Sequence, residues 1–177
     1  LLLQRWIYGE KFSQRFAELY GLTWLAVVGG GVFVIALSGA SASSAPVFAL
    51  TISGLYRLAT IAHGVLSYVF APPFEAEPSR DATRGWVLTA LLIVVEVILI
   101  FALVMYQTGQ EWQPAIESMF TALYQSTITL TTLGYGDIVP ATPLARAIVM
   151  TEVGFFLLLA LVLLPVLVSS MNSDRDT

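Results

Sequence analysis

The sequence predicts an all-α membrane protein with four transmembrane helices and one shorter helix that enters the membrane and returns to the same side. Hydrophobic residues make up 57% of the 177 residues and charged residues only 11%, against about 25% charged residues in typical soluble domains. A helix needs about 20 apolar residues to cross the hydrocarbon core. The stretches that qualify are residues 22–38, 47–70, 86–106 and 144–168.

The segment before the first span, residues 1–21, has the pattern of an amphipathic helix. Aromatic and aliphatic side chains recur at helical spacing, whereas charged side chains fall off that face. This pattern predicts an N-terminal helix at the membrane surface, and a helix packed on other protein fits it equally well. The apolar residues are Phe12, Phe16, Leu19 and Tyr20, and the charged ones are Lys11, Arg15 and Glu18.

The spans divide the chain into two parts. Residues 22–70 form a two-helix front pair, the proline-containing residues 71–85 form a cytoplasmic linker, residues 86–171 form a second module, and residues 172–177 form a tail. Basic residues favour the cytoplasmic side of a membrane. With both termini cytoplasmic, only Arg146 lies outside, and the inside residues are Arg5, Lys11, Arg15, Arg80, Arg84 and Arg175. We therefore expect an integral protein of the plasma membrane with both ends in the cytoplasm.

Residues 114–130, between the last two spans, are too polar and too short to cross a bilayer. They include Glu117, Gln125 and several Ser and Thr residues. We interpret them as a half-helix that dips into the membrane. Pro114 suits the first position of such a helix, where the backbone needs no N–H group.

The half-helix runs into Thr129-Leu-Thr-Thr-Leu-Gly-Tyr-Gly-Asp137, which resembles the selectivity filter of potassium channels. The resemblance implies that the backbone carbonyls of residues 132–136 replace the water around K⁺ and that the Thr132 hydroxyl adds a further ring. Glycine permits backbone conformations closed to other residues, so that successive carbonyls can face one way. Tyr135 should point away and brace the filter. The expected ion-binding residues are Thr132, Leu133, Gly134, Tyr135 and Gly136, with K⁺ held at the first four.

From residue 132 to residue 171 the chain is similar, without a gap, to voltage-gated potassium channels. Near its end this similar segment reads Leu163-Leu-Pro-Val-Leu-Val-Ser169. Pro165 falls on the second proline of the Pro-Val-Pro sequence in that family's inner helix. The resemblance implies a potassium-selective channel. Because one chain supplies one filter strand, it also implies a four-fold symmetric homotetramer. The expected partners are K⁺ ions, the lipid bilayer and three further copies of the chain, with no nucleic acid and no cofactor besides the permeant K⁺.

The sequence departs from this family in two places that bear on function. Tyr124 and Gln125 stand where the family has a tryptophan pair, and the resemblance implies that Tyr124 bonds Asp137. The front pair also contains no helix with arginine at every third position. We therefore predict weak voltage dependence.

Ionisable residues inside the spans are functional candidates because buried charge is costly in lipid. Arg57 and Glu96 are expected at similar depth near the midplane, where they can pair; the alternative is that Arg57 reaches a lipid headgroup. Glu152 is expected to accept hydrogen bonds behind the half-helix and so support the filter, the alternative being a carboxylate that lines the pore. His63 is expected to be a neutral, hydrogen-bonded packing residue rather than one that titrates near neutral pH.

A gate is predicted near the end of the last span. Proline removes a helical hydrogen bond and clashes with the preceding turn, so Pro165 should kink this helix. Leu161, Leu164 and Val168 are candidates for an apolar constriction that blocks ions by dewetting. A non-conducting regulatory subunit and a potassium transporter subunit remain as alternatives. An enzyme is not expected, because the chain has no cysteine, a single histidine and no nucleophile–base–acid set.

Overall fold

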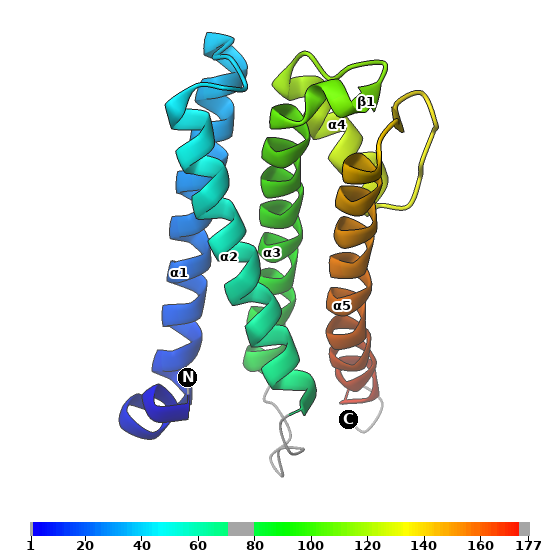
Figure 1. The fold of residues 1–177 in the computed structure, drawn as a ribbon. Helices are drawn as coiled ribbons and strands as arrows, with labels where there is room; N and C mark the ends of the chain where they lie inside the picture. The colour runs from blue at the N-terminus through cyan, green and yellow to red at the C-terminus, as the bar shows by residue number, and fades with distance from the viewer. Residues whose placement is uncertain (1, 71–79, 174–177) are drawn as a thin grey trace.

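The computed structural model describes the backbone of residues 2–70 and 80–173, and the side chains of residues 19–66 and 88–161. The chain folds into helices joined by short connections, with one two-stranded ribbon (Figure 1). The helices are α1 (Leu2–Ser38), α2 (Ala45–Phe70), α3 (Arg80–Gln107), α4 (Met119–Leu130) and α5 (Pro143–Ser173), with a 3₁₀ turn η1 (Gly109–Glu111) and strands β1 (Trp112–Gln113) and β2 (Val139–Pro140).

Four helices are long and apolar enough to cross a membrane, as predicted. The candidate spans are Leu19–Ser38, Ala45–Leu66, Leu88–Gln107 and Pro143–Leu161. Figure 1 shows that α1 begins and α5 ends on the same side of the molecule, while α4 and the loop between α1 and α2 lie on the opposite side. This arrangement agrees with an even number of crossings.

Two element boundaries differ from the expected ones. Helix α1 is continuous from Leu2 to Ser38, so the expected amphipathic segment and the first span are one helix. The side chains of residues 1–18 lie outside the described residues, and the expected apolar face there stays a prediction. Helix α3 begins at Arg80, so that residues 80–85 of the expected linker are helical; residues 71–79 lie outside the described residues.

The prediction that Pro114 opens the half-helix is wrong. Helix α4 begins at Met119, and Ser118 is its N-cap: the Ser118 side chain accepts a hydrogen bond from the Thr121 backbone N–H. A serine at this position satisfies one of the N–H groups that the first helical turn leaves unpaired. The cap therefore defines the helix start, and Pro114 belongs to the connection before it.

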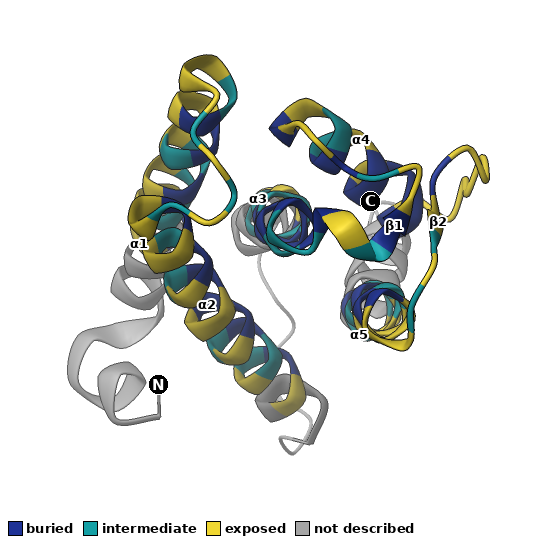
Figure 2. Cartoon of the chain, turned by 45° about the horizontal axis from the view of Figure 1, so that its top comes forward, coloured by how far each residue is buried: buried dark blue, intermediate teal, exposed yellow. Residues whose placement is uncertain are grey.

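Helix α3 is the centre of the fold, between the α1–α2 pair and the α4–α5 pair (Figure 2). Its residues Val97, Ile100, Ala102, Leu103 and Met105 are fully buried. Gly54 of α2 allows close approach to α3, since a Cβ there would lie 3.0 Å from Ile100. The Tyr106 hydroxyl also donates a 2.6 Å hydrogen bond to the Ala40 carbonyl in the α1–α2 loop. The front pair is thus attached to α3 along its length and at its end.

The two short strands join the chain before α4 to the chain after it. They are antiparallel, with Trp112 opposite Pro140 and Gln113 opposite Val139. The Ala141 N–H extends this contact by donating to the Glu111 carbonyl at 3.0 Å. The ribbon therefore holds both ends of the segment that contains α4 and the following loop.

Candidate functional site

The loop of residues 131–138, between α4 and β2, is anchored on the end of α4. The Thr132 N–H donates to the Thr129 carbonyl at 3.0 Å, and the N–H groups of Leu133 and Gly134 both donate to the Ile128 carbonyl at 3.0 and 3.1 Å. These bonds satisfy carbonyls that the last turn of a helix leaves unpaired. The start of the loop therefore has a defined position relative to the helix.

Backbone conformation alternates along this loop. The φ angles of Thr132, Gly134 and Gly136 are 59°, 50° and 76°, all in the left-handed region. Both glycines adopt the expected left-handed conformation, which glycine enters without steric cost. Thr132 in the same region was not predicted. In a regular strand successive carbonyls point to opposite sides, and a left-handed residue at every second position removes that alternation.

The loop is exposed on the single chain, as its position at the edge of the fold shows (Figure 2). Leu133 is 59% and Tyr135 is 68% exposed. Tyr135 was expected to brace the loop, and most of its side-chain surface is exposed on the single chain. Behind the loop lies a groove of about 330 Å³, lined by residues that include Gln125, Thr129, Gly136, Val149 and Val153.

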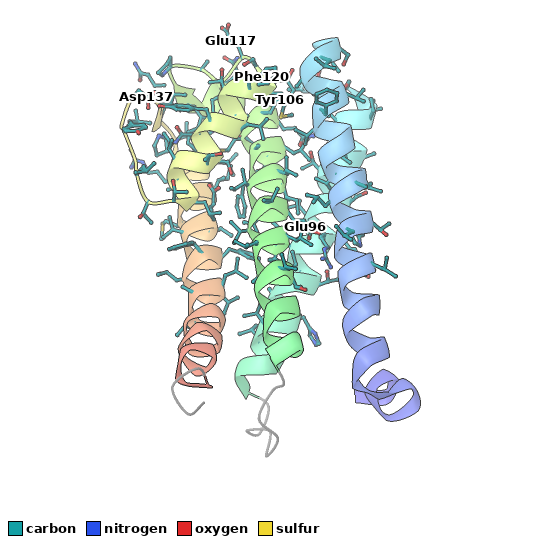
Figure 3. All side chains as sticks on the ribbon, turned by 180° about the vertical axis from the view of Figure 1, so that it is seen from behind. Glu96, Tyr106, Glu117, Phe120 and Asp137 are labelled. Atoms are coloured by element: carbon teal, nitrogen blue, oxygen red, sulfur yellow. The ribbon has the colours of Figure 1, made fainter. Side chains whose placement is uncertain are left out.

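The hydrogen bond expected between Tyr124 and Asp137 is present. Tyr124 Oη donates to Asp137 Oδ2 at 2.7 Å, which connects α4 with the residue that follows the loop. This hydrogen bond raises the pKa of Tyr124 above its usual value, so the phenol keeps its proton at neutral pH. Asp137 lies with Glu117 and Phe120 at one end of the molecule (Figure 3).

Glu152 lies behind α4, as expected, and contacts it through Ser126. Glu152 Oε1 is 2.5 Å from Ser126 Oγ, and the Glu152 residue is 0% exposed. Burial within the single chain does not support the alternative that Glu152 lines a pore. Ser126 was missed by the sequence analysis. Its only signal there was a small polar residue on the face of α4 that also carries the buried Ala122 and Leu130.

Arg57 and Glu96 form the expected ion pair. Arg57 Nε donates to Glu96 Oε2 at 2.8 Å, and their side chains are 9% and 0% exposed. The guanidinium carbon also lies 4.8 Å from the Tyr20 ring centroid and 6.0 Å from that of Trp24, within the range of cation–π attraction. Arg57 is thus paired with Glu96 in the structure, in place of the alternative in which it reaches a lipid headgroup.

This pair lies away from the loop, because Glu96 is about halfway along α3 whereas Asp137 is at the end of the molecule (Figure 3). His63 of α2 is exposed, so the helix packing expected of it is not found among the described residues.

The predicted gate lies on α5, which stays helical from Pro143 through Pro165 to Ser173. Leu161 is 64% exposed and shares one helix face with the exposed Met150 and Leu157. The side chains of Leu164, Pro165 and Val168 lie outside the described residues, so the constriction and the kink stay predictions.

The second half of the chain is similar to known ion channel sequences. Residues 93–172 match the model of a family described as ion channel. A hyperpolarization-activated voltage-gated potassium channel of Methanocaldococcus jannaschii is 48% identical over 44 residues, which are 25% of this chain and 21% of that protein. A voltage-gated potassium channel of Aeropyrum pernix is 53% identical over 34 residues, 19% of this chain and 12% of that protein.

The chain thus matches less than a quarter of the length of either relative, and no solved structure matches it significantly. The family match begins in α3 and extends through α4, the loop and α5. Residues 93–172 are therefore similar to ion channels, and the two related sequences are both voltage-gated potassium channels.

Proposed function

We propose that this chain is one subunit of a tetrameric channel that conducts K⁺ passively, with residues 132–136 as the selectivity filter. The observation that carries the proposal is the left-handed backbone at every second residue of an exposed loop. Such a backbone can present a column of carbonyl oxygens to one axis, and carbonyl oxygens replace the hydration shell of K⁺ in filters of this kind. The Thr132 hydroxyl would add the innermost ring.

The filter requires three further copies, because one strand can cover only one side of an ion. The exposed loop and the exposed apolar face of α5 at Met150, Leu157 and Leu161 support this assembly. Homo-oligomers usually close with cyclic symmetry, so that four loops would meet on a single axis. Contact between copies would then cover Tyr135, which is mostly exposed on its own chain.

Helix α4 would add to cation binding through its orientation. The carbonyl end of a helix carries about half a negative charge, and α4 ends at Leu130, directly before the filter. Four such ends would converge on the cavity below the filter. There they favour a cation that has lost part of its hydration.

The front pair is proposed to be a scaffold and not a voltage sensor, with both termini in the cytoplasm and the channel in the plasma membrane. Arg57 is held by Glu96 and two aromatic rings, so it is poorly placed to move with voltage. The gate would lie at the cytoplasmic end of α5, where Leu161, Leu164 and Val168 surround the axis next to Pro165.

Reversal potentials of the purified protein in planar bilayers test this function. We expect the reversal potential in mixed K⁺ and Na⁺ to follow the K⁺ gradient, with discrete single-channel steps. Near-equal permeability would contradict the filter assignment. A protein silent by itself but active with a second subunit would indicate a regulatory role, and flux without single-channel steps would indicate a transporter subunit.

A further inference from the structure

The Ser126 hydroxyl lies between two oxygen atoms from different helices. Ser126 Oγ of α4 is 2.5 Å from Glu152 Oε1 of α5 and 3.0 Å from the Ile98 backbone carbonyl of α3. Both distances are within hydrogen-bond range for oxygen pairs. The serine on α4 therefore connects this helix to both α3 and α5 at a point behind the loop.

The number of hydrogens limits how these contacts can form. A serine hydroxyl has one hydrogen to donate, and a carbonyl oxygen can only accept. An ionised carboxylate can also only accept, so that one of the two contacts would then bring two oxygens together without a hydrogen between them. If Glu152 carries a proton, both contacts are hydrogen bonds: Glu152 donates to Ser126, and Ser126 donates to Ile98.

The surroundings of Glu152 also favour the neutral acid. Glu152 is 0% exposed, and its second oxygen, Oε2, has no hydrogen-bond partner. No salt bridge of Glu152 occurs among the described residues, where the buried Arg57 is paired with Glu96. An unpaired buried carboxylate costs far more free energy than a buried neutral acid. The protonated form, with its hydroxyl at Oε1 and its carbonyl oxygen at Oε2, is therefore favoured.

We propose that Glu152 is a protonated positioning residue whose hydrogen bond to Ser126 holds α4, and with it the filter loop, against α5 and α3. This proposal rests on the function proposed above for the loop. Loss of the proton would leave an unpaired charge behind α4 and remove one of the two hydrogen bonds through which Ser126 joins α4 to α5 and α3. Conduction should therefore be stable at neutral and acidic pH and decline as the pH rises.

Any pH measurement must distinguish the effect of Glu152 from the effects of the other ionisable groups on these helices. Helix α4 has no charged residue, α3 presents Glu96 toward Arg57, and α5 has the exposed Arg146. Helix α2 adds the exposed His63, and Tyr124 and Asp137 bond each other beside the loop. The side chains of Arg80, Asp81 and Arg84, at the far end of α3, lie outside the described residues.

Infrared difference spectroscopy of the membrane-embedded protein tests the protonation state without requiring conduction. Subtracting the Glu152→Gln spectrum from the wild-type spectrum at neutral pH should reveal the carbonyl band of a protonated carboxyl group. Glu117→Gln is the matched control, because Glu117 is exposed and should contribute only carboxylate bands. A carboxylate band in the Glu152 difference spectrum at neutral pH would overturn the proposal.

Current recorded against pH tests the positioning role. Wild-type current should fall about fivefold or more in alkaline solution, the factor that corresponds to a net loss of ~1 kcal/mol for one hydrogen bond. Glu152→Gln keeps a donor toward Ser126 but cannot ionise, so it should conduct without that decline. An alkaline decline of the same size in Glu152→Gln would assign the effect to another group, such as Tyr124, and overturn the role of Glu152.

Ser126→Ala provides a second, independent variant. It removes the acceptor for the Glu152 proton, and we expect about fivefold lower current at neutral pH on the same basis. Wild-type current and an unchanged pH profile in Ser126→Ala would overturn the link through Ser126. A wild-type protein that conducts no K⁺ would instead refute the proposed function, while the infrared result would still decide the protonation of Glu152.

Discussion

Gly134 adopts a φ of 50° in open space, and a Cβ added to it would have no atom within 4 Å. Because such a Cβ would meet no clash within its own chain, the cost of Gly134→Ala within the subunit comes from the backbone. A left-handed conformation costs an L-residue about 1–2 kcal/mol. We expect Gly134→Ala to reduce the K⁺ over Na⁺ permeability ratio and to weaken the tetramer by about that amount, as measured by reversal potentials and by thermal dissociation of the tetramer.

Gly30→Ala is the matched control for that change. Gly30 of α1 also has no atom within 4 Å of an added Cβ, but it lies in a regular helix. Alanine is favoured over glycine in a helix by about 1 kcal/mol, so this variant should keep its selectivity and be as stable as the wild type or more so. Equal effects of the two alanines would show that the backbone argument at Gly134 is wrong.

Tyr124→Phe removes the donor to Asp137 and leaves the ring in place. Because this hydrogen bond connects α4 with the residue that follows the loop, we expect its loss to appear as a faster decline of current during sustained opening. Because the hydrogen bond raises the Tyr124 pKa, its contribution is complete below the ordinary tyrosine value and is lost only as the pH rises through the raised one. Tyr56→Phe, at an exposed tyrosine of α2, should change neither current nor its pH dependence.

At the scale of elements, the Arg57–Glu96 pair joins α2 to α3. Removing one partner of a buried pair leaves an uncompensated charge and typically costs about 3–5 kcal/mol. Arg57→Leu or Glu96→Leu alone should therefore lower the thermal stability of the membrane-embedded protein strongly, and the double leucine variant should recover most of it. Arg146→Leu, at an exposed arginine of α5, is the control. If the double variant is no more stable than the single ones, the two side chains do not act as a pair.

The cytoplasmic half of α5 is predicted to contain the gate. Proline within a helix lacks one backbone hydrogen bond and clashes with the preceding turn, at a cost of roughly 3 kcal/mol. Pro165→Ala should therefore straighten α5. On the basis of that cost we expect the open probability to change by about tenfold or more. The K⁺ over Na⁺ permeability ratio should stay unchanged, because the filter is on a different element. A change in permeability ratio with normal gating would refute the assignment.

At the scale of the whole molecule, the front pair contains too few charges for steep voltage gating. One charge that moves through 100 mV contributes about 2.3 kcal/mol. Even if Arg57 crossed the whole field in four subunits, the total would be about 9 kcal/mol, well below the tens of kcal/mol that steep gating uses. We therefore expect shallow conductance–voltage curves. An apparent gating charge of about ten or more, near that of channels with 3–4 gating charges per subunit, would show that the front pair is a sensor.

Much of the fold and of the loop was predictable from the sequence, because these features depend on local properties. A span follows from a run of apolar residues about 20 long, and the four spans occur where such runs are found. The positive φ angles of Gly134 and Gly136 follow from the presence of glycine in a motif of known geometry. The motif also indicated the bond between Tyr124 and Asp137, which lie 13 residues apart.

Other features were decided by the tertiary structure. The similar depth of Arg57 and Glu96 along their spans indicated that they could pair. Only the rotation of α2 and α3 about their axes brings the two side chains together. The packing of α1 then places Tyr20 and Trp24 beside Arg57. The contact of Ser126 with Glu152 and Ile98 depends in the same way on how three helices pack. Hydrophobic periodicity defines which residues avoid water; in helices that are apolar on nearly every face, it does not define which faces meet.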